Sequence, residues 1–170
     1  MGTAKNVVRG KATVYIGTAG QTSVGSMTNI GYTTDNGFKL TISRSGNDID
    51  VDQEDMPIDW ERTKEDHKMG FTMAEVTLTN FALALGITGA TNTITLYQSD
   101  MVFQSVGLVA PGAPIGTATS SSTRTYIYPY VLPDGDVTLA AGEKGKAQSV
   151  PCSFRYFRRS TSVVPTVTDA

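Results

Sequence analysis

The chain has 170 residues, of which 39% are hydrophobic, and a formal net charge of −2 at pH 7. This length suits one globular domain, and the slight acidic excess argues against a general nucleic-acid binder. A single cysteine excludes an internal disulfide framework and a zinc cluster. Because no apolar run approaches the ~18 residues of a membrane helix and no leader follows Met1, we expect a cytoplasmic product without a membrane anchor.

Short alternating runs in the first half predict strands over residues 12–17, 27–33 and 38–43. The Asp-Asn-Gly sequence at 35–37 predicts a turn between the last two, since these residue types tolerate positive φ. Residues 1–11 are polar and basic, and two interpretations stay open: a loose terminus, or an N-terminal arm ordered by a neighbour.

Residues 47–65 predict an extended acidic arm in which acids alternate with large apolar side chains. An extended arm cannot bury these apolar side chains within itself, so it must lie on its own body or on a partner. We expect them to form an inter-subunit contact. They are Ile49, Val51, Met56, Ile58 and Trp60.

The spacing of the aspartates at 48, 50 and 52 also suggests a calcium loop. Such a loop requires glycine at its sixth position, where this chain has Gln53, and a glutamate at its twelfth, where it has Asp59. The strand alternation explains the spacing better, and we expect no metal and no cofactor.

One helix is predicted at about 73–85. Thr72 and Glu75 have the spacing of a capping box, and Gly86 supplies the residue that ends a helix. A 3.6-residue period indicates one apolar packing face. The cap and packing residues are Thr72, Glu75, Leu78, Phe81 and Leu85.

The second half predicts further strands, separated by a Pro-, Gly- and Ser-rich loop at 110–122 and followed by a polar tail at 160–170. Pro129 lacks an N–H, so it marks an edge strand or a bulge. Cys152 is most simply a small core residue. The expected strands cover 93–98, 101–108, 124–132 and 146–158.

Little in the sequence points to catalysis. His67 is the only histidine and is most simply a surface strand residue, because no Ser–His–Asp or Cys–His set can be assembled around it. The run of cations and aromatics at 155–159 fits either a nucleic-acid stacking patch or, better, a strand with a basic end. We expect that the protein is not an enzyme.

The segment 44–86 resembles the tail tube (major tail) proteins of long-tailed bacteriophages. In that family a strand leads into a long acidic loop with a Pro-containing apolar patch, followed by a second strand and a helix. The matching helix positions are Ala74, Glu75, Thr77, Asn80, Ala82, Ala84, Leu85 and Gly86.

The resemblance implies a single mainly-β domain over 1–170, an antiparallel β-sandwich or partly closed barrel with one flanking helix. It also implies a virion tail protein that forms hexameric rings stacked into a tube, through which DNA passes without sequence-specific binding. Tape measure and tail terminator proteins are the further partners implied. The same fold occurs in type VI secretion tubes, so a contractile secretion tube is the near alternative.

DNA must slide through such a tube without sticking, so hydroxyl and acidic side chains should line it. The lumen candidates are Thr41, Ser43, Asp48 and Asp50. A competing hypothesis is a monomeric β-sandwich adhesin or carbohydrate-binding module. Its stacking platform would be Trp60, Tyr126, Tyr128 and Tyr130.

Overall fold

The computed structural model describes residues 11–49, 59–87, 101–111, 123–137 and 149–169. The expected strand at 93–98, most of the N-terminal arm and most of the loop at 110–122 lie outside these residues. The described elements are β1 (Thr13–Thr18), the 3-10 turn η2 (Val24–Ser26), β2 (Thr28–Ile49), β3 (Asp59–Met73), α1 (Leu78–Ala84), β4 (Gln104–Pro111), β5 (Thr123–Pro133), β6 (Val150–Tyr156) and β7 (Thr166–Asp169).

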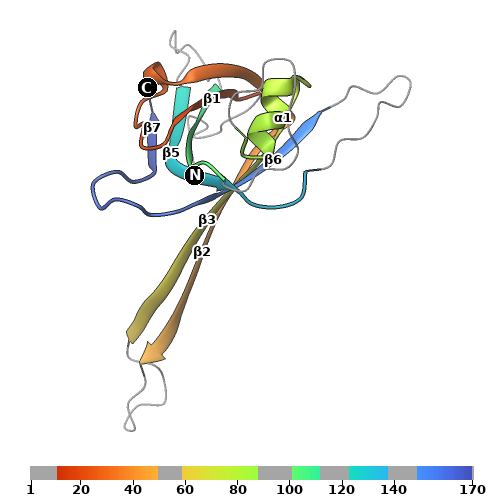
Figure 1. Ribbon diagram of the computed structural model, residues 1–170. Coiled ribbons are helices and arrows are strands. Elements are labelled where there is room, and N and C mark those ends of the chain that lie inside the picture. The colour runs from red at the N-terminus through yellow and green to blue at the C-terminus, as the bar shows by residue number, and fades with distance from the viewer. Residues whose placement is uncertain (1–10, 50–58, 88–100, 112–122, 138–148, 170) are drawn as a thin grey trace, which may run out of the picture.

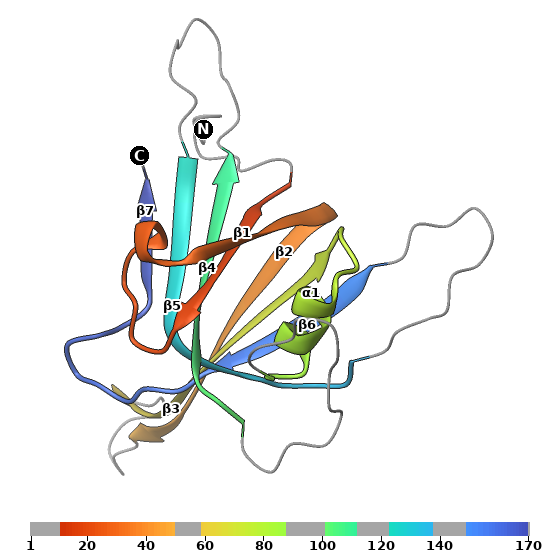
Figure 2. The ribbon, with the colours of Figure 1, turned by 45° about the horizontal axis from the view of Figure 1, so that its top comes forward.

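The strands form one antiparallel sheet in the order β4-β1-β2-β3-β6-β5-β7. Because β4 also pairs with β5, the hydrogen bonding returns on itself, and the sheet is a partly closed barrel of the mainly-β class expected. Figure 2 shows the strongly twisted fan of strands, with α1 packed beside β6.

The core lies inside this curved sheet, where alternate residues of neighbouring strands meet. Phe71 and Phe154 stack with ring centroids 5.8 Å apart, on strands whose pairing also places Met69 opposite Phe154. Cys152 is buried as expected, and burial raises the pKa of its thiol to about 12, so it stays protonated and inert. The buried core joins β3 and β6 to residues of β1, β4, β5 and α1.

The helix begins later than the sequence predicts, at Leu78 rather than near 73. Thr72 belongs to β3, where it pairs with Pro151, so it cannot cap the helix. The cap is Thr77, whose hydroxyl accepts a hydrogen bond from the Asn80 backbone N–H at 3.1 Å. The Asn80 side chain is buried and donates to the backbone carbonyl of Glu75 at 2.8 Å, so its amide group and that carbonyl each have a hydrogen-bond partner.

The buried face of α1 also differs from the predicted one. Leu78 is 43% exposed, and Phe81 and Leu85 are only half-buried, because rotation of the face buries Leu83 and Ala84 instead. Gly86 follows the helix with φ +72, as the sequence predicts for a helix end.

Two bulges in the sheet lie where the sequence suggests a turn and an edge strand or bulge. The expected strands at 27–33 and 38–43 are one strand, β2, because the residues between them are absorbed in a bulge where the pairing shifts. Pro129 marks a second bulge, between the β4 pairings of Tyr128 and Val131, and is fully buried rather than at an edge. The predicted polar tail at 160–170 contains a further strand, β7, which pairs with β5.

Candidate functional site: the projecting hairpin and its bulge

The most distinctive feature of the fold is a hairpin of β2 and β3 that projects from the body (Figure 1). β1 pairs with β2 only near residues 28–32, and β6 pairs with β3 only over 68–73. Within the described residues, β2 after 38 and β3 before 68 therefore pair only with each other. A two-stranded ribbon is marginal alone in water, so this one needs additional contacts.

A bulge in β3 interrupts the hairpin close to the body. Ser45 pairs with Lys64 and the next residue, Gly46, pairs with Arg62, so Thr63 is the extra residue. The Thr63 hydroxyl donates to the Ser45 carbonyl at 3.1 Å, which links the two strands at the bulge. In a regular strand Arg62 and Glu65 would point to opposite faces, but the inserted residue turns them to the same face.

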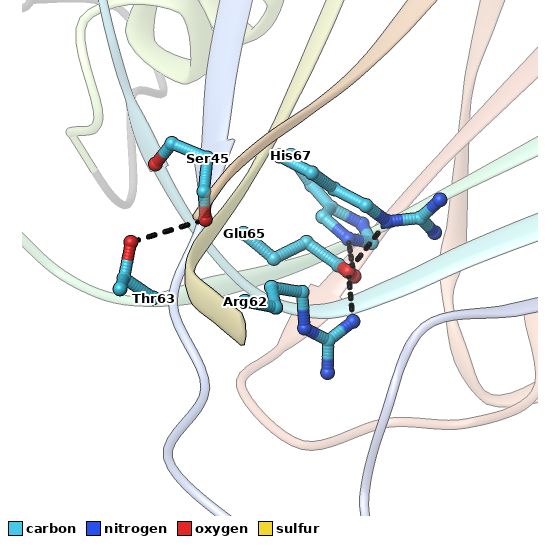
Figure 3. A network of polar contacts seen from close by, with 6 residues as sticks. Ser45, Arg62, Thr63, Glu65 and His67 are labelled. Atoms are coloured by element: carbon cyan, nitrogen blue, oxygen red, sulfur yellow. Dashed lines mark hydrogen bonds and ion pairs between the residues drawn. The ribbon is translucent and has the colours of Figure 1, made fainter. Parts of the chain in front are cut away.

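The carboxylate of Glu65 is the centre of a charge network on that face (Figure 3). It accepts from Arg44 Nε at 2.9 Å and Arg62 Nη1 at 2.6 Å, and lies 2.7 Å from His67 Nε2. The hydrogen bond from His67, followed by that from Arg44, lowers the pKa of Glu65 to about 2. The network links the two strands across the point where the ribbon leaves the barrel.

His67 connects this network to the core. Its ring lies 5.8 Å from that of Tyr156 and 6.1 Å from that of Tyr128, and its side chain is 16% exposed. The side chain of His67 is thus mostly buried and links the network to the core, whereas the sequence suggests a surface strand residue. The Nδ1 atom of His67 and the hydroxyl of Tyr156 are both buried without a hydrogen-bond partner, and burial raises the pKa of Tyr156.

A polar hollow of about 360 Å³ opens beside these two groups. Cationic side chains from both sides of the bulge and from just beyond the end of β6 line it. Its lining residues are Arg62, Thr63, Lys64, Glu65, His67, Tyr156 and Arg158. The sequence shows that these cations are present but does not predict that they lie close together, because the bulge and the pairing of distant strands bring them to one place.

The lumen candidates do not share one face. Thr41 and Ser43 lie on one side of β2, whereas the alternation of the uninterrupted strand places Asp48 on the other. Thr41 pairs with Lys68, whose ammonium lies 2.7 Å from Asp134, so that surface is not purely hydroxyl and acidic. Asp50 lies outside the described residues.

The arm residues are only partly described. Ile49 is 41% exposed at the end of β2, and the backbone of Trp60, in β3, pairs with that of Asp48 in β2. Val51, Met56 and Ile58 lie outside the described residues. The expected extended arm is therefore a paired hairpin up to Ile49 and from Asp59.

The tyrosine platform expected for a carbohydrate-binding module is not formed on β5. Tyr128 is 3% exposed and Tyr126 packs against Phe38 with ring centroids 4.8 Å apart. Tyr130 is half-buried. The buried ring of Tyr128 therefore presents no face on which a sugar can stack.

A second hollow, of about 690 Å³ and mostly apolar, lies between β1, the start of β2 and α1. The side-chain oxygens of Gln21 and Gln104 are buried there without hydrogen bonds. Among the described residues no three His, Cys, Asp or Glu side chains are grouped to hold a metal ion, and no helix could span a membrane.

No protein-family model matches the chain, and no curated protein matches it. Among solved structures, the fold is similar to that of a chain in the cryo-EM structure of the anti-feeding prophage (AFP) baseplate, 6-fold symmetrised. The TM-score is 0.53 at 11% sequence identity, and the match covers 99% of this chain and 97% of that chain. The chain thus has an overall fold similar to that of a component of this baseplate.

Proposed function

We propose that this protein is a structural, non-enzymatic subunit of a phage tail, in which six copies form a ring and rings stack into a tube. The tube is the conduit through which the genome passes into the host cell. The subunit is made in the host cytoplasm and resides in the virion tail, next to tape measure and tail terminator proteins.

The observation that carries this proposal is the projecting hairpin. Its two strands leave the barrel and, in the described part of the chain, pair only with each other, with largely exposed side chains beyond Leu40. An isolated monomer gains no core from such an arm, whereas a neighbouring subunit would cover it and shield its strand edges.

The structural likeness supports six-fold assembly, because the similar chain comes from a six-fold symmetrised particle. That particle is a baseplate, which favours a second candidate: a subunit that forms a ring at the end of a tube rather than along it. A contractile secretion tube is the third possibility within this class. Long tubes from the purified protein would favour the first and third candidates, and single rings the second.

The apolar residues of the arm are the proposed anchors on the neighbour, with Trp60 the largest. Burying an aromatic side chain of this size removes about 150–250 Å² from water, or several kcal/mol at ~25 cal/mol per Å² before ordering costs. That gain would repeat at every subunit of an assembly.

The test is Trp60→Ala, with Tyr32→Ala as a matched control, since Tyr32 is 50% exposed on β2 away from the arm. We expect both variants to fold with wild-type melting temperatures, and only Trp60→Ala to lose large particles in light scattering and negative-stain images. A Trp60→Ala protein that assembles normally removes the arm from the mechanism. A lowered melting temperature of its monomer would show that the arm packs on its own body.

A further inference from the structure

Charge is separated along the projecting hairpin. Residues 45–61 contain seven acids and no lysine or arginine. These acids are Asp48, Asp50, Asp52, Glu54, Asp55, Asp59 and Glu61. The hollow at the base of the hairpin, by contrast, is lined by Arg62, Lys64 and Arg158 against the single carboxylate of Glu65.

Some of the groups that line the hollow remain available to bind an anion. Glu65 already binds Arg44 and Arg62, but neither Lys64 nor Arg158 has a described ion pair, and both face the same hollow. The hydroxyl of Tyr156 is buried at its wall without a partner and can donate to an incoming oxygen. A carboxylate placed there would meet two cations and one neutral donor, which is a strong arrangement for charge-assisted hydrogen bonds.

The hairpin's own described acids do not fill this role. Glu61 directly precedes Arg62, so strand alternation places its carboxylate on the face opposite to Arg62. Asp59 lies six positions before Glu65, which corresponds to about 20 Å along a strand. Charges that far apart in water are largely screened at physiological ionic strength, where the Debye length is about 8 Å.

We propose that the hollow is the receptor for the acidic end of the hairpin, residues 48–59, of a second copy of this chain. The inference rests on the proposed function and deepens it by naming both halves of one contact. The contact joins two different patches, so it is head-to-tail and each copy offers both halves. Such contacts propagate from subunit to subunit, as growth of a stacked assembly requires.

Charge exchange between the two patches tests this inference. The base variant carries Lys64→Glu and Arg158→Glu. The tip variant carries Asp50→Lys, Asp52→Lys, Glu54→Lys and Asp55→Lys, which leaves two acids and four lysines over residues 48–59 and so makes the tip basic. Neither changes Glu65, Arg62 or His67, so the network within the hairpin stays intact. Particle size is measured against protein concentration for wild type, each variant alone, their equimolar mixture, and the protein with all six changes.

We expect each variant alone to need about tenfold or more protein to assemble, because like charges meet at every contact. The mixture should assemble like wild type, because acidic ends then meet basic hollows and basic ends meet acidic hollows. The six-change protein should also assemble. Raised salt should weaken wild-type assembly.

Wild-type assembly by each variant alone would overturn this inference and leave the proposed function standing. Folded variants whose mixture and six-change protein both stay small would also overturn it, since charge pairing then fails to explain the loss. A wild-type protein that remains monomeric at every concentration would overturn the proposed function as well.

Discussion

Replacing Thr77 by alanine should destabilise the protein, because Thr77 begins the helix. The change removes the hydroxyl that accepts the Asn80 N–H at 3.1 Å, and loss of such a cap typically costs about 1 kcal/mol. For a domain of this size, 1 kcal/mol lowers the melting temperature by roughly 2–4 °C. The second contact, from the Asn80 side chain to the Glu75 carbonyl, survives and limits the loss.

Alanine substitutions at two other threonines serve as comparisons for this prediction. Thr79 is exposed on the helix, so Thr79→Ala should be neutral or slightly stabilising, because alanine is the better helix former. Thr72 would be the cap if the helix began where the sequence pattern places it. Thermal unfolding of the three single variants compares them directly. A Thr77→Ala protein as stable as wild type, with Thr72→Ala lowered by the full cap energy, would refute the helix start.

Phe154→Ala should lower the free energy of unfolding by about 3–5 kcal/mol, since Phe154 is 1% exposed and stacked on Phe71. The control Phe157→Ala should cost much less, because Phe157 is 37% exposed. Equal melting temperatures for the two variants would contradict the placement of Phe154 in the core. Burial raises the pKa of Tyr128 from 10.0 to about 12, so its stabilising effect is complete below pH 10 and is lost as the pH rises toward 12. Tyr128→Phe should therefore flatten the fall of stability with pH in this range, as followed by denaturant unfolding, and an unchanged slope would contradict it.

Much of the sheet is predictable from the sequence because strand alternation is a local signal. The runs that became β1, β5 and β6 were identified to within a few residues at most of their ends. β2 was predicted in two pieces, since the Asp-Asn-Gly sequence is typical of a turn. The fold instead absorbs it in a bulge, with Gly37 at φ +67, because pairing with β3 continues on both sides.

The helix start and the charge network depended on tertiary contacts. Thr72 with Glu75 and Thr77 with Asn80 have the same spacing, and only the pairing of Thr72 with β6 decides between them. The role of His67 was not predictable either. It depends on tyrosines from two distant strands, which have no local sequence signature near His67.

The most direct test of the central claim is an end-on view of the assembled protein. Purified wild-type protein at high concentration would be imaged by negative-stain electron microscopy, and end-on particles averaged without imposed symmetry. The account predicts rings of six subunits around a central channel, with a hairpin from each subunit in contact with a neighbour. Particles that remain single subunits at every concentration, or rings whose hairpins contact no neighbour, would contradict it.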